Sequence, residues 1–103
     1  MWTQREAIDL CIAVEAAAPK AGCHVALTGG CLYKTTSEPR KDCDLLFYRI
    51  RQKPKIDIGR LFSLLEELGF KKITGQGWLY KARYNDKPLD LFFPENEDGD
   101  YNP

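Results

Sequence analysis

The first hydrophobic pattern along the chain has the spacing of an amphipathic helix. Ile8 and Ile12 repeat at helical spacing within residues 3–18, and Thr3 followed by Glu6 has the form of a capping box. A proline and a glycine follow soon after the last of these apolar positions and interrupt the pattern. We therefore predict a first helix over about residues 3–18.

The second helical pattern is the more regular of the two. Asp57 can cap its start, and Gly69 followed by Phe70 is typical of a Schellman motif at its end. Between these signals, five apolar side chains share one stripe: Ile58, Leu61, Phe62, Leu65 and Leu68. The stripe predicts a helix over residues 58–68 that packs on a core through one face.

Five shorter segments have the composition of β-strands, at residues 23–28, 42–48, 71–74, 78–84 and 88–93. The turn residues Asn85 and Asp86 predict a hairpin between the last two strands, and residues 75–77 link the third strand to the fourth. The element order is α-β-β-α-β-β-β. It predicts an α+β fold with a mixed, twisted sheet of about five strands and two main helices on one face.

Size and composition indicate one small globular domain. The chain has 103 residues, of which 44% are hydrophobic and 29% are charged. We assign residues 1–94 to a single domain, and we interpret the acidic residues 95–103 as a solvated tail. Charged side chains interrupt residues 1–20, so we expect neither a signal peptide nor a membrane span.

The cysteines and the one histidine argue against a metal or disulfide framework. Cys11, Cys23, Cys31 and Cys43 lie in or beside apolar segments, and no pair has the C-x-x-C spacing. Together with His24 they are poor material for a zinc site. We interpret them as small, reduced side chains of a cytoplasmic protein, and His24 as a hydrogen-bonded strand residue.

Fifteen basic residues balance fifteen acidic ones, but the two signs are unevenly distributed. Residues 34–55 hold seven Lys and Arg against three acids, whereas residues 86–103 hold one Lys against six acids. The balance excludes a general polyanion binder. The basic residues of 49–55 are either a local surface for a nucleic acid or another polyanion, or a solvated face.

Three aspartates occupy predicted strands, where aspartate is disfavoured. Asp42 and Asp44 open one strand, and Asp90 lies inside the last. Residues two apart on a strand point to the same side, so Asp42 and Asp44 project together and a neighbouring strand can add a third carboxylate. Such a cluster repels itself and is stable chiefly around a hard cation, for which Mg²⁺ beside phosphates is the natural choice.

A glycine pair supplies a candidate phosphate site, because it follows a strand and leaves backbone N–H groups accessible to an anion. The glycine pair and the aspartates together resemble the signature of the DNA polymerase β-like nucleotidyltransferase superfamily. The parts of the motif, in chain order, are Thr28-Gly29-Gly30, eleven intervening residues, Asp42-Cys43-Asp44 and then Asp90. The resemblance covers residues 24–93 and implies the fold of a nucleotidyltransferase palm.

The same resemblance implies an activity and its site residues. The enzyme would move a nucleoside monophosphate from a nucleoside triphosphate such as ATP to a hydroxyl of a protein, nucleic acid or small molecule. Asp42, Asp44 and Asp90 would be catalytic and would hold two Mg²⁺ ions. The nucleotide would be bound by the glycine turn and the residues after it: Gly29, Gly30, Cys31, Lys34, Arg40 and Lys41.

Three alternatives to catalysis stay open at this point. In the first, the aspartates are strand-end carboxylates paired with local cations such as Arg40, Lys41 or Lys87. In the second, the chain keeps the palm fold without catalysis and engages a protein or nucleic-acid partner through its basic loop or its acidic tail. In the third, the chain is an interaction module whose acidic surface mimics nucleic acid, which the neutral total charge disfavours.

Overall fold

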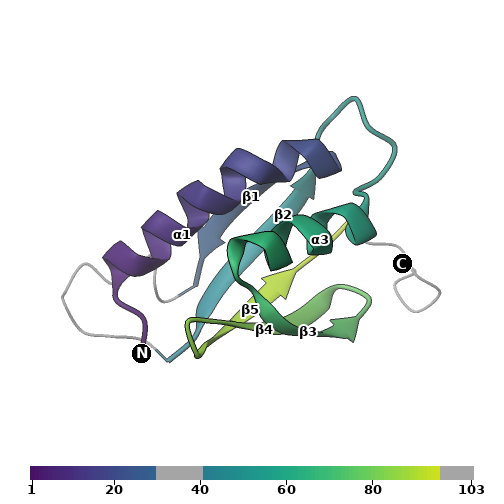
Figure 1. The fold of residues 1–103 in the computed structure, drawn as a ribbon. Coiled ribbons are helices and arrows are strands. Elements are labelled where there is room, and N and C mark those ends of the chain that lie inside the picture. The colour runs from purple at the N-terminus through teal and green to yellow at the C-terminus, as the bar shows by residue number, and fades with distance from the viewer. Residues whose placement is uncertain (30–40, 96–103) are drawn as a thin grey trace.

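The computed structural model describes residues 1–29 and 41–95. Their elements, in chain order, are α1 Gln4–Ala17, the 3-10 helix η1 Ala18–Ala21, β1 Cys23–Thr28, β2 Cys43–Arg49, α3 Ile58–Leu68, β3 Lys71–Gln76, β4 Leu79–Tyr84 and β5 Lys87–Phe92 (Figure 1). The strands form one sheet in the order β1-β2-β5-β4-β3. Strands β2 and β5 are parallel, and the other neighbours are antiparallel.

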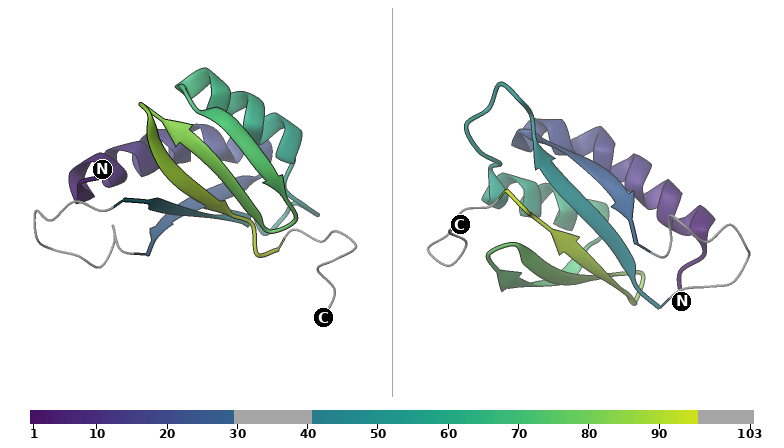
Figure 2. Two further views of the ribbon diagram at one scale, coloured as in Figure 1. Left: turned by 90° about the horizontal axis from the view of Figure 1, so that it is seen from below. Right: turned by 180° about the vertical axis from the view of Figure 1, so that it is seen from behind.

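Helices α1 and α3 lie on the same face of this sheet (Figure 2). The opposite face, which we call the open face, carries no helix within the described residues. This arrangement confirms the predicted α+β class and the mixed five-stranded sheet with two main helices on one face. Within the described residues, no helix has the length and apolar composition needed to cross a membrane.

The start of α1 is capped as predicted. Thr3 Oγ1 accepts a hydrogen bond from the Glu6 backbone N–H at 3.1 Å, and Glu6 Oε1 accepts one from the Thr3 N–H at 2.9 Å. These two bonds form a capping box that satisfies two helix-end donors. The chain then continues past α1 as η1, a turn that the sequence pattern did not predict and in which Pro19 occupies the first helical turn.

Helix α3 has the predicted bounds because both of its caps are made by near neighbours. Asp57 Oδ1 accepts from the Arg60 N–H at 3.0 Å. At the other end, Gly69 donates to Glu66 O and Phe70 donates to Leu65 O, each at 3.0 Å. This hydrogen-bond pair is the Schellman motif that the sequence indicated.

The core lies between the sheet and the two helices. Alternate residues of β2 (Cys43, Leu45 and Phe47) are fully buried, and the Phe47 ring stacks on Phe93 with centroids 5.0 Å apart. Burial also raises the pKa of the Cys23 thiol to about 11, which suits a small core side chain and not a nucleophile. Cys31 lies outside the described residues.

Glu15 fastens α1 to the edge strand β1. One carboxylate oxygen of Glu15 accepts from the Val25 N–H at 2.9 Å, and the other lies 2.6 Å from His24 Nδ1. The carboxylate therefore satisfies a backbone donor of an edge strand. The expectation that His24 is a hydrogen-bonded strand residue is confirmed.

Strands β2 to β5 differ from the prediction by one or two residues at their ends, and two of these differences have a clear physical cause. Strand β2 begins at Cys43, one residue later than expected, because the ladder with β5 begins at the pair of Cys43 and Leu89. Strand β3 continues through Gly75, which was expected to be part of a link. A Cβ at Gly75 would lie 2.5 Å from Leu79 O, so glycine there permits a close backbone approach inside a hairpin.

Candidate active site

One row of polar side chains crosses the open face of the sheet. Thr28 lies opposite Asp44, Asp44 lies beside Asp90, and Asp90 lies opposite Lys81 in the strand registers. Paired residues point to the same side of a sheet, and the alternating neighbour Leu45 is buried under the helices. The row therefore faces away from the helices. The sequence-predicted residues Asp44 and Asp90 are brought together as neighbours on parallel strands.

The two carboxylates form an electrostatically strained pair, which we call the Asp44–Asp90 pair. Asp44 is partly buried, and this burial is the main cause of a pKa above the ordinary value of its carboxyl. The negative charges of Asp90 and Asp42 raise this pKa further, whereas Lys81 lowers it. Asp42 is exposed and lies just before β2. A cation placed at the pair would therefore relieve a repulsion that the fold imposes.

A lysine that the sequence reading missed already supplies one positive charge. Lys81 Nζ donates to Asp90 Oδ1 at 2.9 Å, and the hydrogen bond and charge of Asp90 raise the pKa of Lys81. The two-residue turn at Asn85 and Asp86, where both residues have positive φ, was the signal that could have found it. Counting back from that turn sets Lys81 opposite Asp90.

The structure contradicts the pairing of Asp90 with Lys87. Lys87 is three residues from Asp90 on the same strand, so the two side chains point to opposite faces. Lys87 instead forms an ion pair with Glu6 of α1. Lys41, another cation considered there, is exposed beside Asp42, and Arg40 lies outside the described residues.

The predicted glycine turn begins directly against the pair. Gly29 follows β1 with a left-handed φ of 72°, and a Cβ at this position would lie 2.1 Å from Asp44 Oδ2. Glycine is therefore required both by the backbone conformation and by the close approach of the carboxylate. Of the other predicted nucleotide-binding residues, Lys41 is exposed at the start of the second described range. The remaining four lie outside the described residues: Gly30, Cys31, Lys34 and Arg40.

The pair offers carboxylate oxygens, which are ligands that Mg²⁺ prefers. Within residues 1–29 and 41–95, no group of three or more His, Cys, Asp and Glu side chains is arranged to hold one. Mg²⁺ commonly takes only one or two protein carboxylates and completes its shell with water and substrate phosphates. The Asp44–Asp90 pair fits one such ion by its oxygen chemistry, and a second ion would need Asp42 as well.

An exposed tryptophan lies on the same face of the sheet as the pair. Phe92 is two residues after Asp90 and so shares the open face, and the Trp78 ring stacks on it with centroids 6.3 Å apart and planes 22° apart. Trp78 as a whole residue is 49% exposed. It offers a planar apolar surface on the open face, and the sequence reading did not single it out.

The basic loop after β2 is partly committed to internal contacts. The Arg49 guanidinium donates to the backbone carbonyls of Arg51 and Lys53. Glu95, the first residue of the predicted acidic tail, accepts from the Arg49 N–H at 2.6 Å and lies 3.9 Å from its guanidinium. These contacts stabilise the loop and reduce the positive charge that Arg49 presents to a polyanion.

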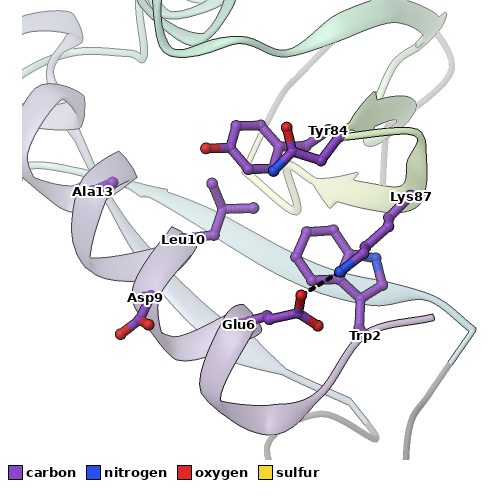
Figure 3. A pocket seen from close by; sticks show the side chains of 8 residues that line it. Trp2, Glu6, Asp9, Leu10, Ala13, Tyr84 and Lys87 are labelled. Atoms are coloured by element: carbon purple, nitrogen blue, oxygen red, sulfur yellow. Dashed lines mark hydrogen bonds and ion pairs between the residues drawn. The ribbon is translucent and has the colours of Figure 1, made fainter.

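A cavity of about 220 Å³ lies away from the carboxylates, between α1 and the turn that joins β4 to β5 (Figure 3). The Lys87 ammonium lies 5.4 Å from the centroid of the Trp2 ring and is ion-paired with Glu6. Trp2 Nε1 also donates to Pro88 O at 2.6 Å. These contacts attach the N-terminal residues to the hairpin, and none of the predicted site residues lines the cavity.

Comparisons with known proteins agree with the fold. No family model matches the chain, and no curated protein matches it either. Among solved structures, the chain is similar to a cytoplasmic RNA terminal U-transferase, with a TM-score of 0.61 and 14% sequence identity. The match covers 91% of this chain and 30% of that protein, so the chain spans less than a third of its length. The chain therefore has a nucleotidyltransferase-like fold.

Proposed function

We propose that this domain binds a nucleoside triphosphate with Mg²⁺ and transfers its nucleoside monophosphate to a hydroxyl of an acceptor. The observation that carries the proposal is the Asp44–Asp90 pair on the open face, with the Gly29 turn packed against it. The nucleotidyltransferase-like fold supports the same reading. Asp42 would join the pair as the third acid, as its effect on the pKa of Asp44 supports.

The chain's own groups have distinct tasks in this reaction. The acceptor oxygen attacks the α-phosphorus, the bond from that phosphorus to the bridging oxygen breaks, and pyrophosphate leaves. The hydroxyl proton passes to a carboxylate of the pair. The glycine turn that begins at Gly29 would direct backbone N–H groups toward the phosphate oxygens at the end of β1. Bound Mg²⁺ would neutralise charge on the phosphate oxygens.

Nucleotide binding with and without Mg²⁺ tests the proposal. Calorimetric titration with ATP, UTP, CTP and GTP should show Mg²⁺-dependent binding that Asp44→Asn weakens at least about tenfold, since a charge-assisted contact contributes about 1.5–3 kcal/mol. Asp86→Asn makes the same change of charge at the hairpin turn and should bind as the wild type does. Binding that ignores both Mg²⁺ and Asp44→Asn would contradict the proposal.

The acceptor is identified by transfer. The protein is incubated in a host lysate with a nucleotide labelled at its α-phosphate, and the labelled product is isolated. We expect a labelled protein or nucleic acid that is absent with Asp44→Asn and present with Asp86→Asn. Label that persists with Asp44→Asn would assign the transfer to another enzyme.

The ion pair of Lys81 with Asp90 favours a second candidate, a palm-fold protein that binds a macromolecule without catalysis. In that case Asp90 is a structural partner of Lys81 and needs no metal. Mg²⁺-independent behaviour in the nucleotide titration, together with an unlabelled lysate, would support this candidate over the first.

A further inference from the structure

Asp90 forms an ion pair with Lys81 at the position where the proposed function requires a metal ion. Lys81 Nζ lies 2.9 Å from Asp90 Oδ1, and the same lysine lowers the pKa of the partly buried Asp44. One ammonium group thus offsets the repulsion of both carboxylates. A divalent cation bound by the Asp44–Asp90 pair competes with this ammonium for the Asp90 carboxylate and repels it.

The two partners of this ion pair differ in their freedom to move. The Asp90 side chain is 20% exposed and projects from β5, which is paired on both sides. The Lys81 side chain is 68% exposed and ends a flexible four-carbon stem. Lysine is therefore the partner that leaves, while the register of β4 with β5 keeps its Cα directly opposite Asp90.

We propose that Lys81 is an exchangeable counter-ion, which a divalent cation displaces from Asp90 and which then binds a phosphate of the nucleotide. The inference rests on the proposed function and names a residue that it did not use. A displaced ammonium beside a divalent cation is repelled by it. A triphosphate supplies acceptor oxygens for the three N–H donors of the lysine and removes that repulsion.

This exchange couples the two ligands. Lys81 competes with a divalent cation that arrives alone, and it assists a cation that arrives with a nucleotide. The two ligands therefore bind with positive cooperativity: each increases the affinity of the protein for the other by the same factor. The site resists occupation by cations alone and is completed by the charged substrate.

The test uses Lys81→Met, which keeps the length of the side chain and removes its charge. Binding of Mn²⁺ without nucleotide is measured from the electron paramagnetic resonance signal of the unbound ion, and binding of ATP is measured at saturating Mn²⁺. The affinity for Mn²⁺ alone should rise about three- to tenfold, and the affinity for ATP should fall by a similar factor, as expected for one nearby charge.

Two further variants separate the role of this lysine from net charge. Lys20→Met removes the same charge from the exposed η1 and should leave both affinities at wild-type values. Lys81→Arg keeps the cation and should restore most of the affinity for ATP. Urea unfolding of each variant, followed by circular dichroism, verifies that the fold is intact.

Opposite shifts of the two affinities in Lys81→Met would support the proposal. An Mn²⁺ affinity that is unchanged or weaker, or an ATP affinity that is unchanged or stronger, would overturn it. If the wild type binds both ligands and Lys81→Met binds them equally well, the role of Lys81 fails and the proposed function stands. If the wild type binds neither ligand, both fail.

Discussion

Replacement of Gly29 by alanine tests the contact between the end of β1 and the Asp44 carboxylate. At the φ of 72°, an alanine costs about 1–2 kcal/mol relative to glycine. The new Cβ would also lie 2.1 Å from Asp44 Oδ2 and 3.2 Å from Asp44 Cβ, so the carboxylate must leave its rotamer at a cost of about 0.5–1.5 kcal/mol. We expect Gly29→Ala to lower the free energy of unfolding by about 2–3 kcal/mol.

Urea unfolding followed by circular dichroism measures this loss, and a double-mutant cycle separates its two causes. Asp44→Ala removes the carboxylate that the new Cβ would meet but leaves the backbone conformation of Gly29 unchanged. In that background Gly29→Ala should cost only about 1–2 kcal/mol. The difference between the two backgrounds, about 1 kcal/mol, is the contribution of the contact itself.

The same variant should also weaken Mn²⁺ binding, because the displaced carboxylate no longer lies beside Asp90. Ordinary surface substitutions change the free energy of unfolding by less than about 0.5 kcal/mol. If Gly29→Ala lowers this free energy by no more than that, the described contact is refuted. An equal cost in the wild-type and Asp44→Ala backgrounds would leave backbone strain as the sole reason for glycine at this position.

Three further predictions concern pH and packing. The raised pKa of Asp44 means that its ionised form destabilises the folded state, so Asp44→Asn should stabilise the metal-free protein at pH 7. This gain should disappear as the pH falls below 3.8, the ordinary pKa of the carboxyl. A variant that is less stable than the wild type in urea at pH 7 would contradict this. The hydrogen bond from Lys87 is the largest cause of a Glu6 pKa of about 2. Glu6→Gln should therefore lower the free energy of unfolding at pH 7 by about 0.5–1 kcal/mol, and this loss should fade between pH 4.5 and about 2. A loss of stability that is constant with pH would argue against the ion pair. Phe47→Ala empties a fully buried ring position and should cost about 3–5 kcal/mol in urea unfolding, whereas a loss near 1 kcal/mol would mean that the core closes around the gap.

The ends of the helices were predictable because each depends on groups a few residues apart. The capping box of Thr3 and Glu6 and the Schellman motif at Gly69 are local hydrogen-bond patterns, and the structure contains both. Strand ends were less predictable, since a strand begins where its partner begins. This is why β2 starts at Cys43 and why Gly75 lies within β3.

The candidate site shows the same division between local and distant determinants. The sequence pattern singled out Asp44, Asp90 and Gly29 individually, and the structure places them in contact or in register. It did not reveal the ion pair of Lys81, although the hairpin turn already implied that register. Trp78 was also missed, because its exposure becomes visible only when the open face has been assembled.

The sequence by itself determined the types of the elements, the ends of the helices and the hairpin that sets Lys81 opposite Asp90. Each of these depends on side chains and turns that are close along the chain. Only the tertiary structure decided that β5 lies parallel to β2, with Asp90 beside Asp44 and the helices on the other face. The pairing of distant strands is selected by the burial of their apolar faces in a common core, which no short segment can specify alone.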